Sequence, residues 1–358
     1  MTMPAEVELL HRMLLIPSPS GHEGELARFL TGAARVLGMD AYVDEVGNFR
    51  ASTGTGDGPT VLLLSHLDTV DDPIPVRLSS DRLAGRGAVD AKGSLAAMLL
   101  AAAGRPAFPG RLEVAGAIEE EVPGSRGAEH LRRTMHRPDA VLIGEPSGWS
   151  NVVLGYKGIL ELRYRVRRPA THPTNPAEKA TEAAAAFWAH ATASLGPGAS
   201  HAAFDRPAAT LTSMTGDLAE ASLDIGYRLP PGFDTADLLE RLRAAARGGD
   251  IEVRGMMAAA RTDRRDPVVR ALTASIRRAG GEPRHKLKTA TSDMNMLAEV
   301  WDVPMAAYGP GDSRLDHSAA EHIVLDDFVR GIAVLGLALD QLAELPTATT
   351  IAALGGQQ

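Results

Sequence analysis

The stretch VLLLSHLDTV, residues 61–70, joins a continuous apolar run to two polar residues at its end. A strand that is buried on both faces of a parallel sheet has this Val/Leu composition. His66 and Asp68 follow where open α/β sheets place their binding crevices, at the carboxyl end of a strand. The stretch therefore predicts a buried parallel strand that ends in a site, although a lone His-x-Asp is also typical of a polar turn.

Composition limits the classes of protein that the chain can represent. Its 358 residues predict two domains, and 44% hydrophobic residues suffice for a sizeable core. A net charge of −8 argues against a nucleic-acid partner. With no cysteine, any metal must be held by His, Asp and Glu. The N-terminus lacks the basic region of a signal peptide, and no long uncharged apolar stretch predicts a membrane span. We expect a soluble, cytoplasmic protein.

The order of predicted elements indicates an α/β domain with an insertion. Up to about residue 157, helical patterns alternate with short apolar strands, as in βαβ units with a mainly parallel sheet. From Gly158 the strand GILELRYRVRR alternates with period two, and the order β-α-β-β-α-β that follows is ferredoxin-like. We predict an α/β domain of residues 1–157 and 268–358 around an insert of residues 158–267. The insert holds 14 basic and 14 acidic residues, so the host segments carry the net negative charge.

Residues that commonly bind metals recur after other predicted strands. They are Asp90 in GRGAVDAKG, the three glutamates of IEEEV, Glu145 in GEPS and His317 in LDHS. Each has an ordinary alternative: Asp90 as a helix cap, the glutamates as a solvated turn, Glu145 and His317 as loop residues. If these strand ends converge at one crevice, however, the repulsion and desolvation of unpaired carboxylates would cost several kcal/mol. Two divalent cations, bridged by one carboxylate, would remove that cost and leave a glutamate as general base.

The ordered motifs HLD, GRGAVDAKG, EEE, GEPS and DH resemble the metallopeptidase and deacylase family of acetylornithine deacetylase, succinyl-diaminopimelate desuccinylase and carboxypeptidase G. The resemblance covers nearly the whole chain and implies a zinc-peptidase-like catalytic domain with an inserted lid and dimerisation domain. It implies two divalent ions per chain, with zinc expected and cobalt as the alternative, and a homodimer formed through the lid.

The resemblance also implies a role for individual residues. The implied metal ligands are His66, Asp90 as the bridge, Glu121, Glu145 and His317. Asp68 would orient the imidazole of His66, and Glu120 would be the general base. An alternative register, in which Glu119 is the general base and Glu120 the metal ligand, stays open. His172 of the lid would stabilise the oxyanion in the partner subunit's site, or is a surface histidine. Arg228 would anchor a substrate carboxylate, or forms an ordinary ion pair in the lid.

The stretches GYKG, KTATSDMNML and YGPGDSRLDHS resemble the branch of this family that releases lysine or ornithine from an amino-group carrier protein, LysW, in lysine and arginine biosynthesis. The resemblance implies that Asp293 lies near the substrate, where it would pair with an ammonium unless it is only part of a helix cap. An acidic carrier would need a basic docking face. Two candidates are offered by Arg163, Arg165 and Arg167 or by Arg284, Lys286 and Lys288.

Other classes of function fit less well. A non-catalytic binding protein on this scaffold would lack the base glutamate that Glu120 supplies. A nucleotide-binding module would rest on Gly85-x-Gly87, which lacks a third glycine and follows no clear predicted strand. Among enzymes, the alternative is an N-acyl amino acid deacylase such as acetylornithine deacetylase.

Overall fold

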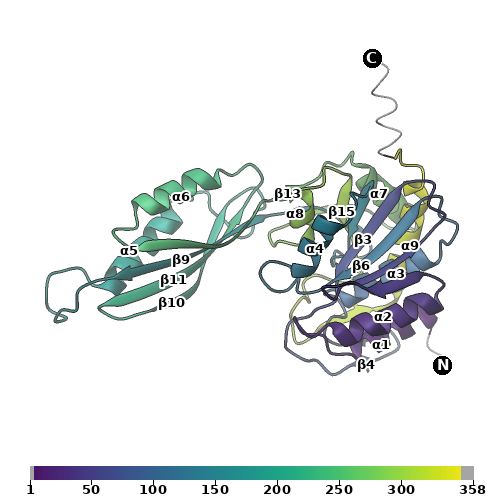
Figure 1. The fold of residues 1–358 in the computed structure, drawn as a ribbon, viewed down its shortest axis with the longest axis horizontal. Coiled ribbons are helices and arrows are strands. Elements are labelled where there is room, and N and C mark those ends of the chain that lie inside the picture. The colour runs from purple at the N-terminus through teal and green to yellow at the C-terminus, as the bar shows by residue number, and fades with distance from the viewer. Residues whose placement is uncertain (1–3, 348–358) are drawn as a thin grey trace, which may run out of the picture. The chain divides into compact units, whose positions relative to one another are not determined.

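The computed structural model describes residues 4–347, which divide into two compact units (Figure 1). The first unit runs to Gly155 and resumes over Thr262–Lys286 and from Ser292 onward, whereas the second comprises Tyr156–Arg261 and Leu287–Thr291. These bounds differ from the predicted ones at residues 262–267, which lie in the first unit, and at residues 156–157 and 287–291, which lie in the second. Asp266 caps the helix that begins at Pro267. The first three residues of the N-terminal stretch lie outside the described residues.

The first unit is a mixed α/β domain built on a large, mainly parallel sheet. Its strands follow the order β1-β2-β6-β3-β7-β15-β8, with β14 also paired to β8. The central strands β6, β3, β7 and β15 are parallel, and the pairings toward either edge are antiparallel. The bounds are β1 Asp40–Val43, β2 Phe49–Thr53, β3 Thr60–His66, β6 Arg111–Ala117, β7 Ala140–Ile143, β8 Asn151–Tyr156, β14 Arg284–Lys288 and β15 Met305–Ala307.

The predicted buried strand, β3, lies between β6 and β7 in this sheet. Its apolar residues from Val61 to Leu64 have no exposed surface, as the continuous Val/Leu run predicts. Each fully buried leucine side chain contributes about 1.5–3 kcal/mol relative to an exposed one. Because β3 is held firmly on both sides, His66 at its last position has a fixed place at the carboxyl edge of the sheet.

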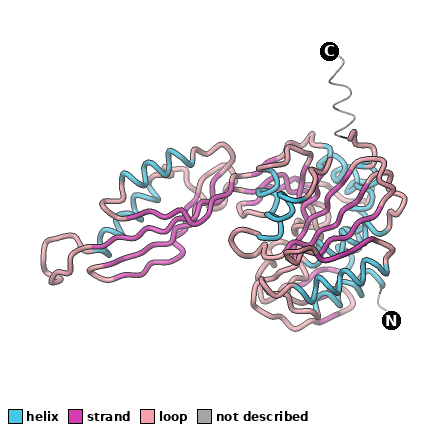
Figure 2. Tube along the Cα trace, in the orientation of Figure 1, coloured by secondary structure: helices cyan, strands magenta, loops and turns pink. Residues whose placement is uncertain are grey.

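The helices of the first unit include one that is buried almost all round. Helix α3 consists mainly of Ala, Leu and Met, and ten of its residues are buried. It packs against α1 and α9, α9 also packs against α7, and α4 packs against α8 (Figure 2). The bounds are α1 Ala5–Leu14, α2 Gly24–Val36, α3 Lys92–Ala103, α4 Arg126–Thr134, α7 Pro267–Arg278, α8 Asp293–Ala298 and α9 Leu325–Leu342.

A small sheet that was not predicted joins two short strands before α3 to one short strand before α9. It has the order β16-β5-β4, with bounds β4 Arg77–Leu78, β5 Arg82–Ala84 and β16 His322–Val324. Strand β5 leads directly into Gly85, so the statement that no strand precedes this glycine turn was wrong. Strands of two or three residues are too short for a periodic pattern to be recognised.

The second unit has the β-α-β-β-α-β element order. Its sheet is wholly antiparallel in the order β10-β11-β9-β12. On β9 the predicted alternation holds: Leu160, Leu162, Tyr164 and Val166 are buried, and Tyr164 stacks on Phe187 of α5 at 3.9 Å between ring centroids. The bounds are β9 Gly158–Arg167, α5 Ala180–Ala193, β10 Ala208–Gly216, β11 Glu220–Leu229, α6 Thr235–Ala244, β12 Asp250–Met257 and β13 Ala260–Arg261.

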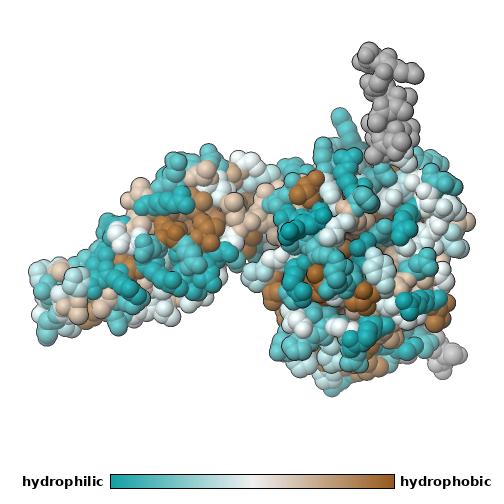
Figure 3. Space-filling model, viewed as in Figure 1, coloured by the Kyte–Doolittle hydropathy of each residue, from teal (hydrophilic) through white to brown (hydrophobic). Residues whose placement is uncertain are grey.

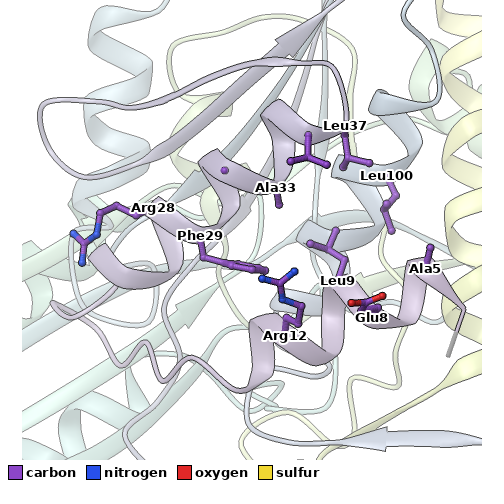
Figure 4. A pocket seen from close by; sticks show the side chains of 11 residues that line it. Ala5, Glu8, Leu9, Arg12, Arg28, Phe29, Ala33, Leu37 and Leu100 are labelled. Atoms are coloured by element: carbon purple, nitrogen blue, oxygen red, sulfur yellow. The ribbon is translucent and has the colours of Figure 1, made fainter. Parts of the chain in front are cut away.

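The surface of the two units is mainly hydrophilic on the face shown in Figure 3. Within residues 4–347, none of the helices combines the length and apolar character that crossing a membrane requires. An apolar groove of about 510 Å³ runs between α1 and α2, where the guanidinium of Arg12 lies 4.8 Å from the ring centre of Phe29 (Figure 4). The groove shares no residue with the cluster described next.

Candidate metal centre

The potential metal ligands stand at the carboxyl ends of neighbouring parallel strands and on adjoining loops of the first unit. His66 ends β3, the three glutamates follow β6, and Glu145 follows β7. Asp90 precedes α3, and His317 lies in the loop after β15. Gly144 permits the close approach of β7 to β3, because a Cβ there would lie 2.6 Å from the Cβ of Ser65.

The carboxylate of Asp90 belongs to two groups of ligand atoms at once. Its Oδ1 lies 3.2 Å from Nε2 of His66, which is 3.9 Å from Oε1 of Glu145. Its Oδ2 lies 3.3 Å from Nε2 of His317, which is 3.0 Å from Oε1 of Glu121. The potential ligand atoms within each group lie within 4.8 Å of one another. One carboxylate thus offers one oxygen to each of two adjacent sites, as a bridging ligand does.

The two ring nitrogens of His66 face different acceptors. Nδ1 lies 2.9 Å from the backbone carbonyl oxygen of Asp68, to which it donates, and Nε2 points toward Asp90, so Nε2 is the nitrogen that would bind a metal. Burial opposes a charge on the ring, but the contacts with Asp68 and Asp90 outweigh it and raise the pKa of His66 well above its usual value.

Asp68 contacts His66 with both its carboxylate and its backbone carbonyl. Its carboxylate is 3.5 Å from Nδ1 of His66, and the shorter contact to the ring is made by its backbone carbonyl. The carboxylate accepts hydrogen bonds from the backbone N–H groups of Glu120 and Glu121, each at 3.0 Å, and from the hydroxyl of Ser20 at 2.7 Å. Asp68 therefore links the end of β3 to the glutamate turn as well as contacting His66.

The three adjacent glutamates have different surroundings. Glu119 points to Arg126, with Oε1 2.7 Å from Nη2 and Oε2 3.1 Å from Nε. Glu121 belongs to the ligand group of His317. Burial, with Glu145, Asp293 and Glu121 nearby, raises the pKa of Glu120 well above its usual value despite the opposing effect of His66. This geometry favours Glu120 over Glu119 as a group that exchanges protons in the site.

The charge balance of the cluster fits divalent cations. Burial and neighbouring carboxylates also raise the pKa of Glu145 well above its usual value. Carboxylates crowded into a partly buried site resist ionisation unless positive charge is supplied. The donor set of imidazole nitrogens and carboxylate oxygens is the one that zinc and similar ions use in proteins. The residues present therefore fit a pair of divalent metal ions.

Asp293 is a further buried carboxylate in the first unit, at the first position of α8. Its Oδ1 accepts a hydrogen bond of 2.5 Å from the hydroxyl of Ser125. Burial raises the pKa of Asp293 to about 6, against the opposing effects of Ser125 and His66. Ser292 caps the helix through its own hydroxyl, so the carboxylate of Asp293 is not used as the cap.

Two predicted site residues lie in the second unit. His172 is exposed in the loop between β9 and α5, with Nδ1 2.8 Å from the hydroxyl of Thr174. Arg228 on β11 is half-buried, donates to the hydroxyl of Thr291 at 3.0 Å, and has its pKa lowered by burial. Their predicted roles toward the substrate stay predictions.

The row of arginines on β9 is paired across strands, which weakens it as a candidate docking face for an acidic carrier. Each is paired with a carboxylate on a neighbouring strand. The pairs are Arg163–Asp224 at 2.6 Å, Arg165–Glu252 at 3.8 Å and Arg167–Glu220 at 3.2 Å. Because the cross-strand partners neutralise the row, it offers little net positive charge to an acidic protein.

Several residues that shape the site were missed in the sequence. Ser20 and Ser125 donate to Asp68 and Asp293, and Glu23 accepts from the backbone N–H of Glu119 at 3.1 Å. Each is far from its partner in the chain, and a single serine or glutamate in a loop carries no periodic signal. Ser20 and Glu23 both lie in the loop stretch IPSPSGHE, three residues apart.

Comparison with known proteins agrees with this geometry. The model of peptidase family M20/M25/M40 matches residues 62–341. A LysW-lysine hydrolase of Deinococcus radiodurans is 42% identical over 354 residues, covering 94% of this chain and 96% of the relative. A Thermococcus kodakarensis protein with the provisional name LysW-lysine/LysW-ornithine hydrolase is 38% identical, covering 94% of this chain and 92% of the relative.

Solved structures share the fold at low sequence identity. An M20 family metallo-carboxypeptidase from Sulfolobus solfataricus has a TM-score of 0.78 at 20% identity, covering 96% of this chain and all of that one. A dinuclear metal binding peptidase of Bacillus subtilis has a TM-score of 0.73 at 12% identity, covering 95% and 98%. The chain belongs to peptidase family M20/M25/M40, and it is a metal-dependent hydrolase.

Proposed function

We propose that this enzyme hydrolyses the amide that joins lysine, or ornithine, to an amino-group carrier protein in lysine and arginine biosynthesis in the cytoplasm. The observation that carries the chemistry is the position of Asp90, with one oxygen in each of two ligand groups and Glu120 beside them. The substrate class is supported by the names of relatives that are 42% and 38% identical over 94% of this chain.

The proposed ligands are His66, Asp90 and Glu145 for one ion, and Asp90, Glu121 and His317 for the other. Zinc is the expected metal and cobalt the alternative, since both suit imidazole and carboxylate donors. When bound, such ions polarise a carbonyl oxygen and make water acidic enough to attack near neutral pH. The protein's own residues supply the remaining functions.

Glu120 is the proposed general base. Its carboxylate takes a proton from the attacking water and returns it to the nitrogen of the departing amine, whose C–N bond breaks. The raised pKa of Glu120 favours the second step, because burial stabilises the protonated, uncharged carboxyl that returns the proton. The exclusion of Glu119 rests on its two contacts with Arg126.

Three further residues are proposed to bind substrate. Arg228 anchors its carboxylate, and Asp293 pairs with its free ammonium, for which a buried carboxylate held by Ser125 is well placed to be selective. His172 serves the site of the partner subunit in a homodimer that forms through the second unit, where it stabilises the oxyanion.

The proposed docking face for an acidic carrier is the second candidate from the sequence, extended by the helix beside it. Residues 262–286 contain seven basic and three acidic residues. Arg264 and Arg277 lie close enough to His285 to lower its pKa, together with burial, and His285 contacts Thr273 of α7 at 3.1 Å. Within residues 4–347 neither arginine is paired with a carboxylate, in contrast to the row on β9.

One residue of this basic face, Lys286, lies in the first unit near a loop that carries a proposed metal ligand. Nζ of Lys286 donates to the carbonyl oxygen of Ser147 at 2.8 Å, two residues beyond the proposed ligand Glu145. Reversing Arg264 and Arg277 to Glu should raise the KM for a carrier-linked substrate and leave that for a small amide unchanged, and salt should mimic the change. Reversing Arg165 of the neutralised row is the control. Equal effects of the two reversals would refute the assignment.

The proposed function is tested by turnover on carrier-linked lysine, carrier-linked ornithine and acetylornithine, with zinc- and cobalt-loaded enzyme. Cleavage of a carrier-linked amide, with little activity on acetylornithine, is expected. Cleavage of acetylornithine alone would replace the proposal by an N-acyl amino acid deacylase. Cleavage of none of the three would leave the metal-dependent hydrolase without its proposed substrate.

A further inference from the structure

A buried carboxylate that plays no part in the proposed chemistry contacts the backbone next to the proposed bridging ligand. Glu321 is four residues beyond His317, and its side chain has no exposed surface. It is outside both groups of potential ligands. Removing a charged group from water costs several kcal/mol unless it is paired and hydrogen-bonded, so its contacts should show its use.

One oxygen of Glu321 holds the backbone at the shared ligand. Oε1 accepts hydrogen bonds from the N–H of Val89 at 2.8 Å and from the N–H of Asp90 at 3.1 Å. Because two adjacent N–H groups are bound by the same atom, the backbone can neither turn nor slide without losing a hydrogen bond. The side chain of Asp90 leaves the chain at this point, and it contributes to both ligand groups.

The other oxygen of Glu321 is held by Arg86, a buried arginine in the loop that carries Asp90. Nη1 of Arg86 lies 2.8 Å from Oε2 of Glu321 and also donates to the carbonyl oxygen of Ser318 at 3.4 Å. Nε and Nη2 of Arg86 donate to the backbone and the carboxylate of Asp72, at 2.7 and 2.8 Å. The backbone N–H of Gly85 donates to the carbonyl oxygen of Glu321 at 3.3 Å.

These contacts join two loops that carry different ligands. Residues 85–90 carry Asp90, and residues 317–321 carry His317. The distance between the two ligands, 3.3 Å from Oδ2 to Nε2, depends on how these loops lie against each other. We propose that Glu321, paired with Arg86, is a positioning residue that holds the bridging carboxylate in register with His317 and so allows two ions to bind together.

The inference rests on the ligand set of the proposed function and predicts a particular signature. In Glu321→Gln an amide N–H₂ would face Arg86, so the carboxylate–guanidinium contact is lost although the side chain keeps its size. We expect the zinc dissociation constants of both ions to rise together, by about 10–100-fold, as for other residues that support ligands. His317→Ala should instead weaken mainly the ion of its own group.

Asp266→Asn is the matched control. Asp266 is likewise a carboxylate that accepts backbone N–H groups, from Val268 at 2.8 Å and Met305 at 3.2 Å, but it joins two elements that carry no proposed ligand. Both variants should lower the urea midpoint of the metal-free protein, because both oxygens of each carboxylate accept hydrogen bonds and an amide would place an N–H₂ against one of the donors. Only Glu321→Gln should weaken zinc binding and alter the visible absorption spectrum of the cobalt-loaded protein.

Zinc affinity is measured by competition with a chromophoric chelator. If Glu321→Gln does not fold, Arg86→Lys is measured instead, because lysine keeps the charge but not the planar fork that contacts Glu321 and Asp72 together. Wild-type zinc affinity and cobalt spectrum in the folded variant, with reduced stability alone, would overturn the proposal. His66→Ala is run alongside: if it too binds both ions normally, the ligand set itself is wrong.

Discussion

The buried carboxylate of Asp293 allows a quantitative prediction about stability. In the unfolded chain an aspartate titrates at 3.8, whereas burial raises the pKa of Asp293 in the folded, metal-free protein to about 6. Each pKa unit corresponds to 1.36 kcal/mol, so above pH 6 the folded state is disfavoured by about 3 kcal/mol by this charge. Below about pH 4 the carboxyl is protonated in both states and the cost disappears.

Asp293→Asn removes the charge and keeps an oxygen that can accept from Ser125. We therefore expect the metal-free variant to be more stable than the wild type at pH 8 by about 2–3 kcal/mol, and equally stable at pH 4. The measurement is urea unfolding of the chelator-treated proteins at the two pH values. Ser125→Ala is the control: it leaves the charge without its donor and should be less stable than the wild type at pH 8.

The result should also bear on function. If Asp293 binds the ammonium of the substrate, the stabilised Asp293→Asn variant should show a raised KM for an amide of lysine, and less change for an acetylated amino acid without an ammonium. Equal stability of variant and wild type at pH 8 would refute the reasoning from burial. A gain in stability with an unchanged KM for the lysine amide would support the effect of burial on stability and exclude a role of Asp293 in substrate binding.

Three further predictions concern the metal centre and the dimer. Elemental analysis of the metal-loaded protein should find about two divalent ions per chain and fewer in His66→Ala or His317→Ala; a metal-free wild type with full activity would contradict the proposal. Glu120→Gln should lower kcat by about 10²–10⁴-fold with metal retained. A large loss in Glu119→Gln instead would show the register to be wrong. Nearly inactive His172→Ala and Glu120→Gln chains should recover activity when mixed, because one site of a mixed dimer has both native residues; absence of recovery despite proven exchange would exclude a role of His172 across the dimer.

Patterns within short stretches were sufficient for much of the architecture. The apolar run before His66 predicted the buried strand, and the alternation from Leu160 to Val166 predicted the half-buried strand of the second unit. Both patterns arise because a strand places successive side chains on opposite faces, so burial on one face or two is written in consecutive residues. The ordered motifs that carry the family resemblance likewise include every residue of the two ligand groups.

Only the tertiary structure decided which residues that are distant in the chain contact one another at the site. That Glu119 faces Arg126, that each arginine of the β9 row has a carboxylate partner, and that Glu321 holds the backbone of Asp90 could not be predicted by spacing. A periodic pattern records which face of an element is buried, whereas a hydrogen bond or ion pair between loops depends on where the whole sheet brings their ends. For this chain, local sequence determined the elements and the candidate ligands, and tertiary packing determined which carboxylates face the centre and which support it.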